Sequence, residues 1–135
     1  AYLSSTLIKL IINNINYQRK FVSYMNNNDN MFSLKKIVNE QLTADKILID
    51  YLGNKSFHNV RFLKKTLNDV FNIQIEEECQ DWLNHAVNIR HDCVHRAGYD
   101  KDNKPVELNK SSIKLLINNI ESLVHKLEKE LPVEL

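Results

Sequence analysis

Apolar side chains recur every three or four residues along most of this chain, which is the spacing of a helix that buries one face. The pattern predicts a first helix over Ser4–Tyr24, a second over Ser33–Leu52, and a third that opens at Ser56 and runs through Phe71. The stretch MNNNDN separates the first two, because Asn and Asp side chains compete for the backbone and favour turns. Gly53 is expected to stop the second helix.

A fourth helix is predicted from near Glu76, where three consecutive acidic residues suit the positive end of a helix dipole. It should end at Gly98, which is expected to adopt a left-handed cap conformation. The polar segment YDKDNKPVEL that follows is expected to form a short hairpin-like turn. Asn109 should then cap the last helix, which carries the most regular apolar stripe of the chain, and Pro132 should mark its end.

These elements predict an all-α fold: an antiparallel bundle of four long helices with a short fifth, in a single domain over residues 1–135. Two glycines and two prolines leave few positions for the tight turns of an all-β fold. The 18 Lys and Arg against 17 Asp and Glu give a net charge of +1, so any site for a polyanion must be local. No run approaches the roughly 20 apolar residues that a membrane span needs, and we expect no membrane partner.

The two cysteines are expected to remain reduced. Cys79 and Cys93 lie on the same predicted helix, where their Cα atoms would be roughly 21 Å apart. A disulfide requires Cα atoms within about 7 Å, so these two cannot bridge within that helix. Reduced thiols, together with the lack of a secretory apolar segment, indicate a cytoplasmic protein.

Titratable and cationic side chains concentrate near the end of the fourth predicted helix, in the stretch NIRHDCVHRAG. Some have a structural explanation: Asp92 and Arg96 are four residues apart and can pair on an exposed face, and basic residues in a last turn complement the helix dipole. Arg90 is different, because it falls on the apolar stripe of its helix. A guanidinium there needs an anionic partner or an interface, which indicates a functional site.

Two kinds of chemistry are disfavoured here. His91 and His95 are one turn apart and could share a metal ion, but no Glu follows His91 and no further ligands cluster in the sequence, so no metal site is expected. Cys93 lies on the apolar side of the helix, which predicts a buried and unreactive thiol rather than a nucleophile.

A third arrangement combines Arg90 with His95. On an ideal helix they lie about 140° apart and about 7.5 Å along the axis, which suits a groove shared by two copies of the chain better than one helix face. A phosphodiester in that groove would meet a guanidinium for its charge and an imidazole for proton transfer. These are the groups needed to cleave RNA with its own 2′-hydroxyl.

The spacing from Arg90 to His95, near the end of a long helix in a small all-α protein, resembles the R-x4-H motif of the HEPN superfamily. The continuation HRAGYDKDNKPVEL is similar to the corresponding segment of its RiboL-PSP-HEPN-like branch. The resemblance implies a metal-independent endoribonuclease of the toxin or antiviral-defence type, without a cofactor. It implies a homodimer that acts on RNA and not on DNA, with an antitoxin protein as a further partner. By position, Arg90 would bind the phosphate and His95 would be the general base or acid.

Other residues of the motif would have supporting roles, namely His91, Asp92 and Arg96. Family members commonly carry Asn after the arginine, so His91 would either orient the phosphate or supply a second imidazole. In one toxin branch a tyrosine two residues after the histidine is modified; that position is Ala97 here, and Tyr99 is the nearest candidate. The resemblance also leaves open a non-catalytic HEPN-type module that binds a partner protein, a nucleotide or RNA.

Overall fold

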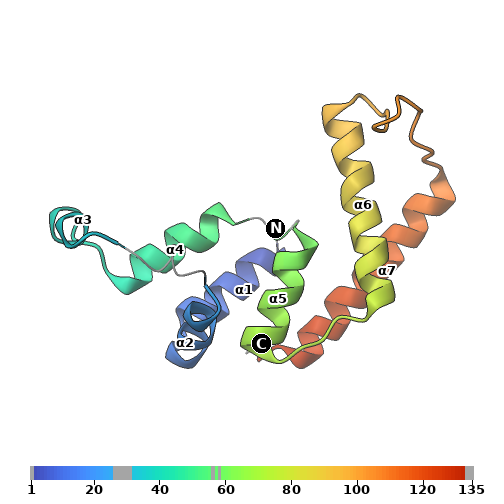
Figure 1. Cartoon of the computed structure of the whole chain (residues 1–135). Coiled ribbons are helices and arrows are strands. Elements are labelled where there is room, and N and C mark those ends of the chain that lie inside the picture. Colours follow the sequence, from blue (N-terminus) through green and yellow to red (C-terminus); the bar gives the residue numbers. More distant parts are fainter. Residues whose placement is uncertain (1, 26–31, 56, 58, 133–135) are drawn as a thin grey trace. The chain divides into compact units, whose positions relative to one another are not determined.

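The computed structural model describes residues 2–25, 32–55, 57 and 59–132, and over these ranges it contains helices and no strand (Figure 1). The helices are α1 (Tyr2–Ile12), α2 (Ile15–Ser23), α3 (Leu34–Asn39), α4 (Ala44–Asn54), α5 (Val60–Phe71), α6 (Glu77–His95) and α7 (Lys110–Glu130). The expected all-α class is therefore confirmed. None of the described helices is both long enough and apolar enough to cross a membrane.

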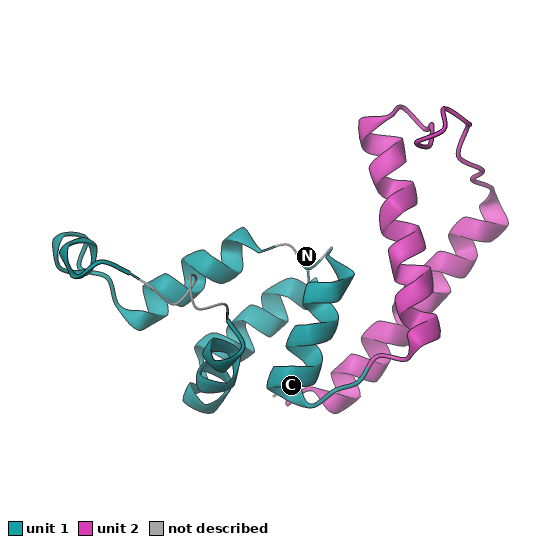
Figure 2. Cartoon of the chain, in the orientation of Figure 1, with its two compact units in different colours: residues 1–74 teal, residues 75–135 magenta. Residues whose placement is uncertain are grey.

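The chain divides into two compact units, residues 1–74 and residues 75–135 (Figure 2). The first contains α1 to α5, and the second contains α6 and α7. The single domain over residues 1–135 stays a prediction.

The first predicted helix is two helices in the structure. Asn14 lies between α1 and α2, and its side-chain oxygen accepts hydrogen bonds from the backbone N–H groups of Asn16 (2.9 Å) and Tyr17 (3.3 Å). An asparagine that caps the second helix in this way competes with continuation of the first. The expected helix over Ser4–Tyr24 is therefore interrupted near its middle.

The second predicted helix is also divided, into α3 and α4. Gln41 adopts a left-handed backbone conformation (φ 50°), and Thr43 then caps α4 by accepting a hydrogen bond from the Lys46 N–H at 3.3 Å. The expected stop at Gly53 is wrong, because Gly53 lies inside α4 and Lys55 is the cap residue. Without a left-handed conformation at Gly53, nothing there ends the helix.

The third predicted helix corresponds to α5. Its expected start at Ser56 lies outside the described residues, as does most of MNNNDN. Asn59 caps α5 by accepting a hydrogen bond from the Phe62 N–H at 3.2 Å, and Asn72 ends it in a left-handed conformation (φ 54°).

The first unit contains a hydrophobic cluster to which four of its helices contribute. In it α1 packs against α2 and α4, and α2 packs against α5. The buried members of the cluster are Ile11, Phe21, Leu48, Leu52 and Val70. The interruption at Asn14 lets α1 and α2 pack against each other at this cluster, whereas α3 contributes no residue to it.

In the second unit the expected boundaries of α7 are confirmed. Asn109 and Ser112 form a reciprocal capping box at its start, and Pro132 follows the C-cap residue Leu131 at its end. Figure 2 shows α6 and α7 separating toward the turn that joins them. Within α6, every residue of which is described, none is buried, and α7 buries only Leu123 and Leu127.

Candidate functional site

Helix α6 ends at His95, two residues before Ala97, the last helical residue that the sequence predicts. The backbone carbonyl of Asp92 accepts hydrogen bonds from the N–H groups of Arg96 (2.9 Å) and Gly98 (3.1 Å). Gly98 adopts the expected left-handed conformation (φ 87°), but Ala97 does so as well (φ 53°). Two successive left-handed residues turn the chain sharply, so the last helical residue is His95.

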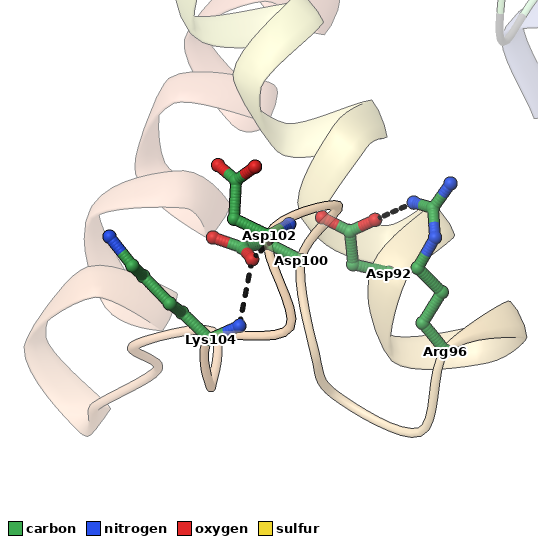
Figure 3. Close-up of polar contacts among 5 residues, drawn as sticks. All are labelled: Asp92, Arg96, Asp100, Asp102 and Lys104. Carbon is green, nitrogen blue, oxygen red and sulfur yellow. Dashed lines mark hydrogen bonds and ion pairs between the residues drawn. The ribbon is translucent and has the colours of Figure 1, made fainter.

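The segment after α6 is the hairpin-like turn that the sequence predicts. Tyr99 and Pro105 form an isolated antiparallel bridge at its base. The side-chain oxygen of Asp100 accepts hydrogen bonds from the backbone N–H groups of Asp102 (2.8 Å) and Lys104 (2.9 Å), as Figure 3 shows. Tyr99, the candidate for modification, is 46% exposed at the base of this ordered turn.

The expected ion pair between Asp92 and Arg96 is also confirmed (Figure 3). The side chain of Asp92 is 14% exposed and that of Arg96 is 34% exposed, so the pair is partly shielded from water. The backbone carbonyl and the carboxylate of Asp92 thus both bind Arg96. Both contacts lie within the last turn of α6 and its cap residue, so they stabilise the end of the helix.

The ion pair borders a hollow of about 450 Å³ between α6 and the turn. Its lining brings together three of the predicted supporting residues with four others that the sequence did not indicate: His91, Asp92 and Arg96 with Asn88, Asp100, Lys101 and Asp102. Three carboxylates against two permanently charged cations make this hollow unfavourable for a phosphate. In the sequence, the two-residue spacing of Asp100 and Asp102 in a predicted turn was the only signal for this hollow.

The two histidines of the motif lie side by side on the surface. The ring centroids of His91 and His95 are 4.6 Å apart, with an angle of 47° between the ring planes, and both residues are exposed. In the described part of the chain, no group of three His, Cys, Asp or Glu residues is placed to hold a metal ion. The arrangement offers two imidazoles within reach of one ligand.

Arg90 does not face a core. From the apolar stripe in the sequence, Arg90 was expected on the buried side of the helix, whereas it is exposed in the structure. The reason is that α6 and α7 separate toward their turn, so the stripe continues beyond Val87 without a surface to cover it. Arg90 forms no ion pair with any described residue. Its guanidinium is therefore available to an external anion.

The expected burial of Cys93 is wrong for the same reason, because this thiol is exposed. Cys79, four turns earlier on α6, is half-buried, and neither cysteine forms a disulfide, as the sequence predicts. Burial raises the pKa of the Cys79 thiol, and the ammonium of Lys126 opposes part of that effect.

Comparisons with protein-family models, with characterised proteins and with solved structures gave no match to this chain.

The two thiols should differ in reactivity. Near pH 8, iodoacetamide should alkylate Cys93 faster than Cys79 by about tenfold or more. The thiolate is the nucleophile, and the raised pKa lowers the fraction of Cys79 in that form, while burial limits the access of the reagent to it. The difference should narrow as the pH rises through the pKa of Cys79. Mass spectrometry of the peptides that contain each cysteine measures both rates in one sample.

The denatured protein provides the control, since the two cysteines should then react at similar rates. Equal rates in the native protein, or faster alkylation of Cys79, would contradict the exposure of the α6 end.

Proposed function

We propose that this chain is a HEPN-like, metal-independent endoribonuclease whose site is formed by two copies at the end of α6. One observation carries the proposal: Arg90 and His95 are both exposed on the last turns of α6, and no described residue neutralises Arg90 by an ion pair. An unpaired guanidinium near two adjacent imidazoles is a suitable set of groups for a phosphodiester.

Exposed apolar side chains on the second unit favour its association with a partner chain. Val94 lies one turn beyond Arg90 on the same face of α6 and is 59% exposed. Ile113, Ile117 and Ile120 on the stripe of α7 are exposed as well. Covering a half-exposed aliphatic side chain contributes about 1 kcal/mol, so these residues would contribute on the order of 8 kcal/mol in a symmetric pair. That apolar contribution alone is comparable with the cost of association, so a dimer that persists at micromolar concentration also needs polar contacts across the interface.

A two-fold arrangement would also account for the angle between Arg90 and His95. Residues about 140° apart on one helix cannot share a face, but across a two-fold axis Arg90 of one copy can approach His95 of the other. The hollow beside Asp92, with its excess of carboxylates, would lie next to this groove and not form the phosphate site.

The proposed reaction uses the substrate's own hydroxyl. Arg90 binds the non-bridging oxygens of the phosphate and stabilises the charge that develops on them. The imidazole of His95 takes the proton of the 2′-hydroxyl, whose oxygen attacks the phosphorus while the bond to the 5′-oxygen breaks. His91, with its ring 4.6 Å from that of His95, supplies the proton to the leaving oxygen. The products are a 2′,3′-cyclic phosphate and a 5′-hydroxyl.

The biological setting follows from the family resemblance. An RNase of the toxin or antiviral-defence type would act on cytoplasmic RNA, and an antitoxin protein would restrain it. A HEPN-type module that binds RNA, a nucleotide or a protein without cutting is the outcome to expect if the cleavage tests fail.

Light scattering at micromolar concentration should give about twice the 15.9 kDa of one chain. Val94→Glu should give the monomer mass, because a carboxylate placed in an apolar interface is costly to desolvate. Val38→Glu is the matched control, since Val38 is also an exposed valine but lies in the first unit, and this variant should remain dimeric.

A monomer at every concentration tested, or dissociation by Val38→Glu to the same degree as by Val94→Glu, would count against an interface at the end of α6.

Arg90→Ala and His95→Ala should each lower the rate of RNA cleavage by about 100-fold or more, the usual contribution of a group that stabilises developing charge, for Arg90, and of a positioned acid or base, for His95. Both side chains are exposed, so the melting temperature of each variant should stay close to that of the wild type. His85→Ala is the control, because His85 is an exposed histidine on the same helix but outside the motif. Gel analysis of a labelled RNA, with EDTA present, measures the rates.

A substrate with a single 2′-deoxy sugar at the cleavage position should resist the enzyme. Cleavage of that substrate, loss of activity with EDTA, or collapse of the melting temperature in Arg90→Ala would each overturn this assignment of the site.

A further inference from the structure

The first unit contains a pocket of about 160 Å³, which lies among α2, α4 and α5 and is separate from the motif at the end of α6. Four of the eleven aromatic residues of the chain line it: Phe21, Tyr24, Tyr51 and Phe62. Phe21 and Tyr51 meet edge to face, with ring centroids 5.9 Å apart. Such a concentration of rings around one small space favours a planar aromatic guest.

The size of the pocket limits the guest. A cavity of about 150 Å³ is sufficient to hold one benzene molecule. The pocket therefore has room for one six-membered ring with a small substituent, while larger groups would have to extend into solvent.

Two lysines at the pocket give it a charge preference. The Lys55 ammonium lies 4.8 Å from the centre of the Tyr51 ring, and the Lys65 ammonium donates a hydrogen bond to the backbone carbonyl of Tyr24 at 3.4 Å. Each ammonium has three donors, so donors remain for a ligand. Neither lysine forms an ion pair within the described ranges.

One carboxylate, that of Asp69, also lines the pocket. It lies one turn after Lys65 on α5, where it can partly offset that lysine, and it accepts a hydrogen bond from the Asn68 amide at 3.0 Å. Two ammonium groups against one carboxylate still leave a positive excess. The polar wall is completed by Thr66, which is almost fully buried.

We propose that this pocket binds a small aromatic anion, namely a single planar ring that bears one carboxylate or phosphate group. The ring would lie between Phe21, Tyr51 and Phe62, and its anionic group would contact Lys55 and Lys65. This site does not depend on the proposed ribonuclease activity, and it would give the first unit a ligand of its own.

The test is a titration of the full chain with benzoate and with phenyl phosphate, followed by the backbone amide signals in NMR spectra. Both should bind with millimolar or tighter dissociation constants and shift signals of α2, α4 and α5. Benzyl alcohol, which has the same ring without the charge, should bind about tenfold more weakly, because a charge-assisted hydrogen bond is lost. Whichever of the two anions binds more tightly would show whether a carboxylate or a phosphate fits the lysines better.

Lys65→Met should weaken benzoate binding by about fivefold to tenfold, since it removes the charge but keeps most of the apolar stem. Lys64→Met is the matched control, because Lys64 is the exposed neighbouring lysine on α5 and does not line the pocket. If the melting curve shows that Lys65→Met is not folded, Lys55→Met replaces it with the same expected loss. Equal binding of benzoate and benzyl alcohol, equal weakening by Lys64→Met, or no saturable benzoate binding would overturn the proposal.

Discussion

The apolar stripe of α6 is only partly covered by α7, and the exposure of the motif at the end of α6 depends on this incomplete packing. Within α6, whose residues are all described, none is buried, although Trp82, Leu83, Ala86 and Val87 form an apolar stripe. Because α6 and α7 separate toward their turn, this stripe loses its cover where the motif begins (Figure 2). At this helix end the exposed apolar side chain of Val94 lies beside the charged and titratable groups of the motif, and protein interfaces combine apolar and polar groups in this way.

Polar contacts between nearby residues stabilise the end of α6, where packing against α7 is lacking. The ion pair of Asp92 with Arg96 stabilises the last turn of α6, and the hydrogen bonds that Asp100 accepts stabilise the hairpin that follows (Figure 3). The two histidines lie on the last turns of α6 with their ring centroids 4.6 Å apart, and Arg90 precedes His91 directly in the chain. Preorganisation of this kind favours a site that works by positioning.

The sequence predicted those features that depend on nearby residues. The cap at Asn109, the left-handed Gly98 and the pair of Asp92 with Arg96 all follow from short spacings, and the structure contains each of them. The interruptions at Asn14 and Thr43 were missed, because a capping side chain inside an apolar stripe is compatible with both a continuous and a broken helix.

The exposure of Arg90 and Cys93 could not be read from the sequence, for a different physical reason. Periodicity shows which face of a helix is apolar, but it does not show whether another surface covers that face. Both residues lie on or beside the apolar stripe, and both are exposed, because the covering helix α7 diverges there. The pocket between Phe21 and Lys65 was missed because its rings come from three separate helices.

The central claim is that two copies of the chain share one site, and mixing two inactive variants tests it most directly. Arg90→Ala and His95→Ala, each inactive alone, should regain RNA cleavage when they are mixed and allowed to exchange subunits. About half of the dimers in an equal mixture are then heterodimers, and each of these retains one Arg90 facing one His95 of the other copy. If the mixture remains as inactive as the separate variants while mass analysis shows that heterodimers have formed, the shared site is contradicted.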